Sequence, residues 1–260
     1  MGYTNTGSTA CVSAGGTMIS TVVSYSISRT NQSPGSGVTS KSSKGTKNVN
    51  GPRTWRAGCV ARSMPSGLGP GQSGEFRGCQ GDSGVIQSGQ VLCVGMSTTI
   101  DLKTFAPIEW RYEYQGTGPM TESVGTMLDT SPPQTITARG ASYTVNGSAG
   151  SWNLAQVDIS LTCEAAGGNA TSKSSKNCRY VRGPTGGTIS LLFENDRLSE
   201  IGISNGDSIS FSITLSNGQT LSLSNILVTG FGDVTLDNSS PEPITIPVSG
   251  VLSCWGGGLI

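Results

Sequence analysis

Thr39-Ser40-Lys41-Ser42-Ser43-Lys44 recurs letter for letter as Thr171-Ser172-Lys173-Ser174-Ser175-Lys176. The two copies are 132 residues apart, and the same shift aligns residues on both sides of them without a gap: Ile27 with Ile159, Ser28 with Ser160, Thr30 with Thr162, and Gly51-Pro52 with Gly183-Pro184. Near the end of each half the shift becomes 136, where Thr99, Asp101 and Ile108 match Thr235, Asp237 and Ile244. A self-match of this period takes precedence over any local motif. Composition explains a Ser- and Lys-rich phrase but not the register around it, so we interpret the chain as a tandem duplication.

The duplication predicts two domains of ordinary size. Residues 1–128 form the first, with residues 1–15 as a flexible N-terminal arm, and residues 136–260 form the second. Each is large enough to bury its own core. The linker, residues 129–135, contains Pro132-Pro133, which keeps it extended and sets the domains side by side.

Composition predicts a mainly β protein. The chain has 38 Gly, 12 Pro and no His, and Gly, Ser, Asn and Pro favour turns between strands over helices. Lys plus Arg equals Asp plus Glu at 16 each, so net charge gives no indication of nucleic-acid binding. Seven cysteines without a C-x-x-C pair or a histidine argue against a zinc site. We see no secretory signal and no apolar span, and expect free thiols in a reducing cytoplasm.

Alternating apolar residues predict corresponding strands in the two halves. In the first strand of each half, Val23, Tyr25 and Ile27 share one face, as do Ala155, Val157, Ile159 and Leu161. The expected strands are 17–30, 53–62, 91–96 and 108–114 in the first half, and 152–162, 188–194, 206–215, 221–229 and 244–248 in the second. Asn217-Gly218 predicts a hairpin turn with positive φ at both residues. Residues 63–90 show little pattern, and only 198–203 and, less clearly, 75–79 suggest a short helix.

Two long polar loops, residues 31–52 and 164–184, occupy the same place in the two halves. Loops of this length are uncommon unless they have a function. Since both copies keep the repeated phrase, we expect ordered contact loops that join subunits or rings. The candidate residues are Thr39, Lys41, Lys44, Gly51 and Pro52 in the first loop, and Thr171, Lys173, Lys176, Gly183 and Pro184 in the second.

No motif predicts catalysis. Gly81-Asp82-Ser83-Gly84 resembles the nucleophile segment of trypsin-like proteases, but that serine needs a base and the chain has no histidine. Gly256-Gly257-Gly258 lacks the Lys-Ser/Thr of a phosphate-binding loop. We therefore expect no catalytic, cofactor-binding or metal site and no enzymatic activity.

The repeated segment resembles the major tail tube proteins of long-tailed phages (siphoviruses). That family commonly reads Asp-Val-Thr-Ser/Thr-Lys-Asp, then a Gly-containing turn and a Leu-Pro-Gly-Leu-Lys-Ser-Trp-like strand. Val38-Thr39-Ser40-Lys41 and Gly51-Pro52-Arg53-Thr54-Trp55 stand in those places, and so do Ala170-Thr171-Ser172-Lys173 and Gly183-Pro184. Ser42 and Ser174 replace the usual acid after the lysine. The resemblance covers most of both halves.

The resemblance implies two tandem β-sandwich or partly closed barrel domains, each with at most one short helix. One sheet of each domain would line the lumen of a ring, and the long loop would contact the next ring. The protein would be a structural part of the virion tail, assembled in the host bacterial cytoplasm, and a conduit for genome ejection. The implied partners are other copies of the chain, the tape measure protein and genomic DNA in the lumen, and the tail terminator and distal tail proteins at the ends, with no membrane.

Tail tubes of single-domain subunits are expected, by this resemblance, to have six-membered rings. A chain with two copies can fill two adjacent places, so three chains would form a homotrimer with pseudo-sixfold symmetry and stack helically. The rival is six chains per ring, with one copy displayed outside the wall. We favour three chains because both copies retain the repeated phrase.

Other functions fit a tandem β protein. One is another structural role in the virion, such as capsid decoration or a distal tail or baseplate ring. Another is a carbohydrate-binding adhesive module, which would expose aromatic side chains; the alternating Trp110, Tyr112 and Tyr114 are the candidates. A core or interface position is the simpler interpretation of that stripe.

Overall fold

The computed structural model describes residues 2–6, 10–31, 36–38, 46–48, 52–63, 65–80, 84–127, 135–149, 153–170, 177–194, 202–231 and 245–252. The described residues form strands and turns and contain no helix, so the expected mainly β fold is confirmed. The strands are not closed into a barrel. No helix among these residues could span a membrane.

The first half has ten strands, seven of which form a sheet that folds into two packed layers. The strands of this half are β1 (Gly2–Thr6), β2 (Ala10–Ala14), β3 (Thr17–Ile19), β4 (Val22–Asn31), β5 (Ser36–Val38), β6 (Thr46–Asn48), β7 (Arg53–Ala61), β8 (Ser73–Gln80), β9 (Val85–Asp101) and β10 (Glu109–Val124). Strands β4, β7, β10 and β9 lie side by side, and β9 also pairs with β8, which continues through β2 to β3. β1 pairs with the free edge of β4, and β5 and β6 form a separate hairpin.

The second half repeats this topology strand for strand. Its strands are β11 (Ser142–Val145), β12 (Ser148–Ala149), β13 (Asn153–Ala170), β14 (Cys178–Glu194), β15 (Ser208–Thr214), β16 (Thr220–Phe231) and β17 (Thr245–Leu252). Their order, β13-β14-β17-β16-β15-β11-β12, is that of β4-β7-β10-β9-β8-β2-β3. The duplication seen in the sequence is therefore also a duplication of strand pairing.

Local irregularities are repeated as well. A bulge separates Val22 from Ser24 in β4, and another separates Leu154 from Gln156 in β13. At one turn Gly71 N donates to Cys93 O and Cys93 N to Gln72 O; at the other Gly206 N donates to Val228 O and Val228 N to Asp207 O. Bulges and turns set where a strand bends, so the two halves share curvature as well as strand order.

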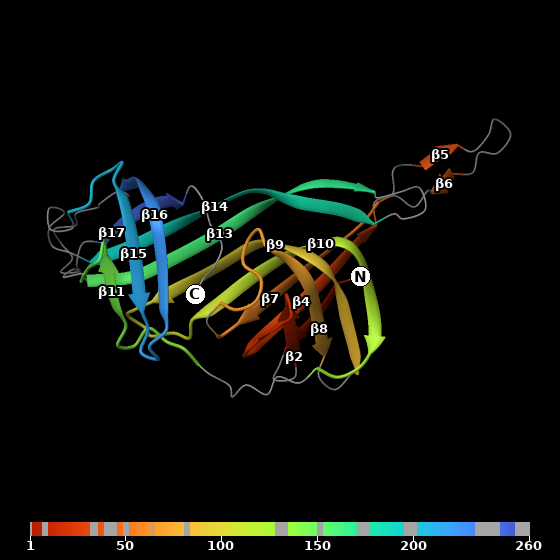
Figure 1. Cartoon of the computed structure of the whole chain (residues 1–260), viewed down its shortest axis with the longest axis horizontal. Helices are drawn as coiled ribbons and strands as arrows, with labels where there is room; N and C mark the ends of the chain where they lie inside the picture. The colour runs from red at the N-terminus through yellow and green to blue at the C-terminus, as the bar shows by residue number, and fades with distance from the viewer. Residues whose placement is uncertain are drawn as a thin grey trace.

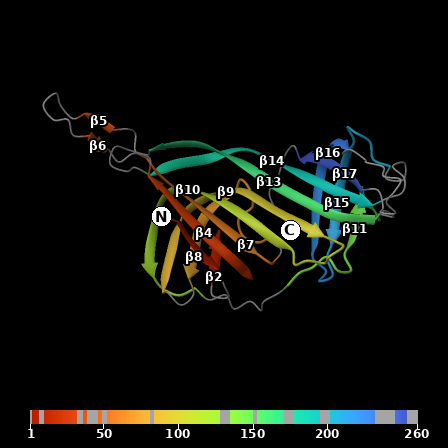
Figure 2. The same cartoon turned by 180° about the vertical axis from the view of Figure 1, so that it is seen from behind.

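The two halves are joined edge to edge. β9 pairs with β13 in antiparallel register from Gly95↔Thr162 to Asp101↔Gln156, which makes one continuous sheet (Figures 1 and 2). Leu102 N donates to Ala155 O at 2.9 Å, and Ile108 N donates to Ile136 O at 2.8 Å. An ion pair between Lys103 and Glu194 also crosses the junction.

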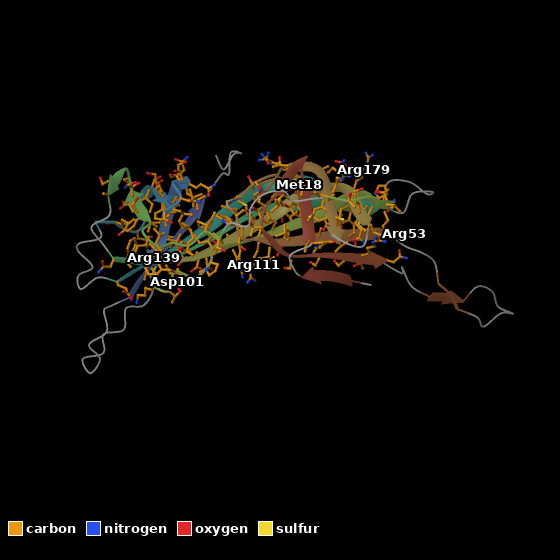
Figure 3. All side chains as sticks on the ribbon, turned by 90° about the horizontal axis from the view of Figure 1, so that it is seen from below. Met18, Arg53, Asp101, Arg111, Arg139 and Arg179 are labelled. Carbon is orange, nitrogen blue, oxygen red and sulfur yellow. The ribbon has the colours of Figure 1, made fainter. Side chains whose placement is uncertain are left out.

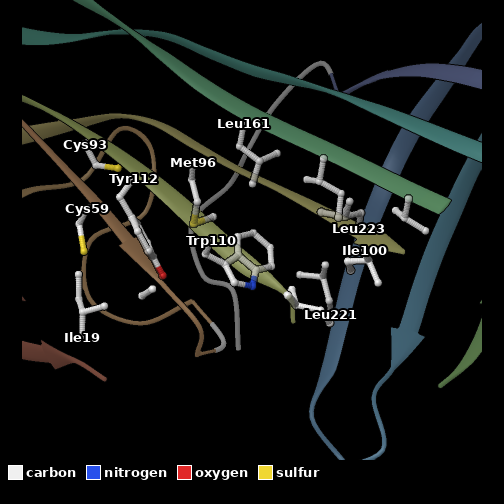
Figure 4. Packing of buried hydrophobic residues seen from close by; sticks show 14 of the residues in the cluster. Ile19, Cys59, Cys93, Met96, Ile100, Trp110, Tyr112, Leu161, Leu221 and Leu223 are labelled. Atoms are coloured by element: carbon white, nitrogen blue, oxygen red, sulfur yellow. The ribbon is translucent and has the colours of Figure 1, made fainter. Parts of the chain in front are cut away.

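The hydrophobic core is continuous through both halves. Within each half the two layers meet through aromatic side chains. The ring centroids of Phe76 (β8) and Tyr114 (β10) are 5.5 Å apart, and those of Tyr143 (β11) and Phe193 (β14) are 6.5 Å apart. Figure 4 shows Met96, Ile100 and Trp110 of the first half close to Leu161, Leu221 and Leu223 of the second, all in one buried cluster. Burial of this apolar surface stabilises the junction.

Several sequence expectations were right. The alternating residues of the strands at 53–62, 108–114, 188–194 and 206–215 are buried as predicted. In β4 the bulge places Val22, rather than Val23, in the core beside Tyr25 and Ile27. At the second-half hairpin only Gly218 has a positive φ, because the connection spans three residues: Gly218 N donates to Leu215 O, and Leu215 N to Gln219 O.

Three expectations were wrong. Residues 1–15 are not a flexible arm throughout, because they include β1 and β2, and β2 is buried along its whole length. Residues 75–79 are strand β8, not helix, since Phe76 and Cys79 face the core. Residues 164–184 are mainly strand: β13 continues to Ala170 and β14 begins at Cys178. The linker residues 129–134 and residues 198–201 of the other expected helix lie outside the described residues, and the domain boundaries stay a prediction.

Candidate functional site

Strand β9 divides one edge between two partners. Its first part, Ile86 to Leu92, pairs with β8 of its own half, whereas Gly95 to Asp101 pairs with β13 of the other half. The change of partner follows the bulge at Val94, which separates Gly95↔Glu113 from Cys93↔Tyr114 in the pairing with β10. The bulge bends β9 away from β8, so its second part can pair with β13 of the other half.

The corresponding part of β16 has no such partner within the described chain. β16 pairs with β15 as far as Leu227↔Ser208, and Val228 is held by Asp207 and Gly206. A bulge at Thr229 follows, as at Val94, because the β17 register passes from Gly250↔Val228 to Ser249↔Gly230. By this match Gly230 corresponds to Gly95. The described strand pairings of Gly230 and Phe231 are with β17 only.

The strands β4, β7, β10, β9, β13, β14, β17 and β16 form one layer that spans both halves. The face of this layer that points away from the core is rich in hydroxyl groups. On the strands β4, β9, β13 and β14 the residues that alternate with the core include ten with a hydroxyl group: Ser24, Ser26, Ser28, Thr30, Ser97, Thr99, Ser160, Thr162, Thr188 and Ser190. An open groove on this face crosses β10, β9, β13 and β14. Figure 3 shows Arg111 and Asp101 on one long side of the molecule, opposite Met18 of the covering layer.

Acidic side chains slightly outnumber basic ones on this face. It carries Arg56, Arg62 and Arg111 against Asp101, Glu109, Glu113 and Asp158, and no lysine on its described strands. Two of the arginines are engaged: Arg62 donates to Glu109 Oε1 through Nε and Nη2 at 3.0 Å, and Arg56 Nε donates to Gln115 Oε1 at 3.0 Å. Hydrogen bonds from Thr104 lower the pKa of Asp101, so it stays ionised at neutral pH. Few cations remain to hold a phosphate.

A polar contact on this face spans the junction. Thr99 Oγ1 of β9 donates to Asp158 Oδ1 of β13 at 2.6 Å, and Gln156 Nε2 donates to Asp158 Oδ2 at 2.7 Å. Cross-strand pairs of this kind support sheet pairing. The joint between the halves thus has backbone hydrogen bonds, an apolar side and a polar side.

The strands that lead to the two lysine-bearing segments end side by side. β13 and β14 extend from the second half over the first, toward the end from which the β5–β6 hairpin projects (Figure 1). An isolated parallel bridge joins Arg53, at the start of β7, to Asn177, just before β14. Of the sequence-predicted site residues, Thr39, Lys41, Lys44, Gly51, Thr171, Lys173 and Lys176 lie outside the described residues, and Pro52 directly precedes β7.

Gly183 and Pro184 lie inside β14, and not at the end of a loop as predicted. A bulge in β13 between Cys163 and Ala165 brings Glu164 close, so a Cβ at Gly183 would lie 2.8 Å from the Glu164 carbonyl oxygen. Pro184 donates no hydrogen bond, and it is tolerated because β17 pairs with β14 only from Gly187 onward. The Gly-Pro dipeptide was thus mistaken for a strand boundary.

The aromatic stripe of β10 belongs to the core. Trp110, Tyr112 and Tyr114 are each at most 2% exposed. Their Nε1 and hydroxyl atoms are buried without a hydrogen-bond partner in the described structure. These rings cannot stack on a sugar from solvent, so the stripe gives no support to a carbohydrate-binding module.

The six described cysteines are buried, and none of them is in a disulfide. Cys11 and Cys79 are register partners on β2 and β8. Burial raises the pKa of Cys59 and of Cys93 from 9.0 to about 12, so both thiols stay protonated at pH 8. Burial also raises the pKa of Tyr112 and Tyr114.

These thiols and phenols predict a loss of stability in alkali. Their folded pKa values lie above the unfolded ones, so their contribution is complete below about pH 9 and falls as pH rises toward the folded values. We expect the melting temperature to decrease from pH 9 to pH 11.

Alkylation at pH 8 should spare Cys59 and Cys93 in the native protein and reach all seven cysteines after denaturation without reductant. Rapid native labelling of either thiol, or fewer than seven modified sites, would contradict this prediction.

Among the described residues, no group of His, Cys, Asp or Glu side chains could hold a metal ion. No protein-family model matches the chain. A search of curated proteins finds none that is similar. The features on which function can be argued are therefore the repeated sandwich, its edges and its hydroxyl-rich face.

Proposed function

We propose that this chain is the major tail tube subunit of a long-tailed phage, with three chains in each ring. The observation that carries the proposal is the joint between the halves. Two units of the same topology are paired edge to edge, so one chain would supply two neighbouring places of a cyclic array. A contact that adds identical units with a constant rotation closes into a ring when the rotations add up to a full turn, and otherwise gives an open helix.

Ring closure would repeat the internal joint between chains. The end of β16, Gly230 and Phe231, corresponds to Gly95 and Met96 of β9. It would pair with Thr30 and Arg29 of β4 in the next chain, as Gly95 and Met96 pair with β13. Each chain would supply eight strands to the wall, β4-β7-β10-β9 and β13-β14-β17-β16, so three chains would supply twenty-four. Closure would also remove the open edges that cause uncontrolled association.

The hydroxyl-rich face would line the lumen. A conduit for DNA must not retain it, and retention grows with each lysine or arginine that pairs with a phosphate. This face offers Ser and Thr hydroxyls, acids that outnumber arginines, and arginines already engaged by Glu109 and Gln115. The tape measure protein would fill the same lumen before ejection, and the tail terminator and distal tail proteins would cap the ends.

The two lysine-bearing segments would make the contact between stacked rings. The support is that the strands leading to both end on the same side, with Arg53 bridged to Asn177. Ring closure and stacking would then use separate surfaces, as a tube requires. A protein that formed rings but never stacked would instead fit a distal tail or baseplate role.

Negative-stain microscopy of the purified chain tests the proposal, and long tubes are expected. We predict that replacing Lys41, Lys44, Lys173 and Lys176 with Ser leaves a folded protein that forms single rings but few tubes, because the charges act at stacking. Replacing four exposed arginines outside these segments, Arg77, Arg111, Arg139 and Arg182, with Ser serves as a charge-matched control. Normal tubes in the four-lysine variant would exclude the stacking role, and discrete particles from the wild type would exclude the tube.

A further inference from the structure

The second half reaches over the first half with an arm. The arm consists of residues 163–170 of β13 and residues 178–185 of β14, which pair with each other beyond the end of the joint. Figure 1 shows β13 and β14 crossing the first half, where β14 contacts β10 without pairing with it. Glu164 and Tyr180 of the arm line one wall of a cleft, and residues of β4, β7, β9 and β10 line the other wall.

The β5–β6 hairpin is the counterpart of this arm in the first half. Its pair Val38↔Thr46 lies 132 positions before the pair Ala170↔Cys178 of the arm. The hairpin projects beyond the first half (Figure 1), and among the described strands β5 and β6 pair only with each other. The chain thus has two arms of the same register, and one of them is seated on a neighbouring unit.

The turn that the arm covers in the first half is open in the second half. A Cβ at Gly71 would lie 2.9 Å from Arg182 Nε and 2.9 Å from Thr185 Cγ2 of the arm. At Gly206, which makes the same turn in the second half, a Cβ would meet no atom within 4 Å. Gly71 is accordingly buried and Gly206 exposed.

A leucine on the strand beside this turn shows the same difference. Leu92 is the register partner of Gln115, which lines the cleft beside the arm, and Leu92 is 1% exposed. Leu227 is its counterpart at the shift of 135 that relates Gly71 to Gly206, and Leu227 is 48% exposed. The second half therefore presents an apolar side chain to solvent where the first half has a buried one, and burying it against a partner would be favourable.

The open groove on the second half matches the cleft under the arm. Six residues on the first-half wall of that cleft belong to β4, β7 and β9. The counterparts of all six, at shifts of 132 for β4 and β7 and 135 for β9, line the open groove: Asp158, Ser160, Thr188, Ile189, Ser190 and Thr229. The second half thus carries the surface on which an arm is seated in the first half.

We propose that the β5–β6 hairpin docks on the second half of another copy of this chain, at the open groove and the Gly206 turn. This inference rests on the proposed ring, because the copy is the one whose β16 would meet Thr30 and Arg29 of β4. The hairpin would hold neighbouring chains together within a ring. The lysine-bearing segment between β5 and β6 would remain for the contact between rings.

Charge at the proposed contact is complementary. Arg53 lies 132 positions before Thr185, so it would lie against Gly206 as Thr185 lies against Gly71. Arg53 is exposed, and so is Asp207, the residue next to Gly206. An arginine opposite an aspartate favours this pairing of surfaces over others.

A photoreactive side chain tests the contact on the full chain. With p-benzoylphenylalanine in place of Arg53, we expect cross-links to residues 204–207 of a second copy once the protein has assembled. The same probe in place of Arg182, whose side chain lies against Gly71, is the internal control and should cross-link to residues 69–72 of its own chain at any protein concentration. Chains of normal and heavy isotope composition are mixed, since only a cross-link between copies can join a light peptide to a heavy one. Tubes without a cross-link between copies from position 53, while the control probe reacts, would overturn the docking and leave the tube standing.

Leu227→Asp gives a second measurement. The hairpin would bury this carboxylate, so the protein concentration at which half of the chains assemble should rise roughly tenfold or more. The melting temperature of the free subunit should stay close to that of the wild type, because Leu227 is 48% exposed there. Val124→Asp is the matched control: Val124 is 93% exposed on β10 of the first half, and this variant should assemble normally.

The outcomes separate this inference from the tube itself. Unchanged assembly of Leu227→Asp would mean that the hairpin does not cover this face, and would overturn the docking. Open chains of copies that are cross-linked from position 53, without any tubes, would support the docking and overturn the tube. No association of the wild type would overturn both.

Discussion

A chain that carries Thr30→Cys and Gly230→Cys is expected to become a covalently closed trimer on oxidation. In the internal joint Thr162 and Gly95 are register partners, and Thr30 and Gly230 are their counterparts in the other two copies of those strands. Opposed residues of an antiparallel pair lie within the Cα separation that a disulfide spans. Thr30 is exposed and lies beyond the part of β4 that β1 covers, and a side chain at Gly230 meets no atom within 4 Å.

The measurement is a non-reducing denaturing gel with three controls. Each single substitution should stay monomeric, because the six described native thiols are buried. Gly95→Cys with Thr162→Cys should bridge within one chain, which shows that the register accepts the bond. The double variant should end at the trimer because a ring has no free edge. A ladder that continues past three chains would mean an open helical contact, and a monomer would mean that β16 and β4 never meet.

Lysines placed on the hydroxyl-rich face are expected to convert a passive lumen into a DNA-binding one. Thr162 and Thr188 are exposed and lie on neighbouring strands of that face. Thr162→Lys with Thr188→Lys would add six cations to each three-chain ring. Since binding grows with the number of phosphates neutralised, with a slope in log–log salt plots of about −0.9 per contact, retention should rise steeply at low salt and vanish at high salt.

Gln90→Lys with Ser224→Lys supplies the matched control, because both residues are exposed and neither lines the groove. Assembled tubes of each variant would be incubated with short duplex DNA and sedimented across a salt series. The lumen variant should retain DNA at low salt, and the wild type and the control should not. Equal retention by both lysine variants would place the hydroxyl-rich face on the outside of the tube.

The sequence predicted the repeated strands well because their buried residues alternate clearly. Trp55, Ala57, Cys59 and Ala61 in one half and Ile189, Leu191 and Phe193 in the other are core residues in the structure, as expected. The duplication helped, since a weak pattern in one copy could be checked against the other. The resemblance implied a sandwich, but alternation did not predict its covering layer, because β8 and β2 are rich in Gly, Cys and Ala and show little alternation.

The edges escaped prediction for a different reason. A pairing between β9 and β13 depends on backbone groups, and the alternation of Ser97, Thr99, Ser160 and Thr162 only says that one face is polar. β1 was missed since Gly2–Thr6 contains no aliphatic side chain. The Gly183-Pro184 error has the same origin: a bulge at Glu164 that no composition rule reveals made the glycine necessary.

A three-dimensional reconstruction of the assembled protein by electron cryo-microscopy is the most direct test of the central claim. The account predicts stacked rings of three chains, with eight strands from each chain in a continuous wall, β16 of one chain paired with β4 of the next, and Ser160 and Thr188 facing the lumen. Rings of six chains with one sandwich outside the wall would contradict it, and so would a wall in which β16 and β4 do not meet.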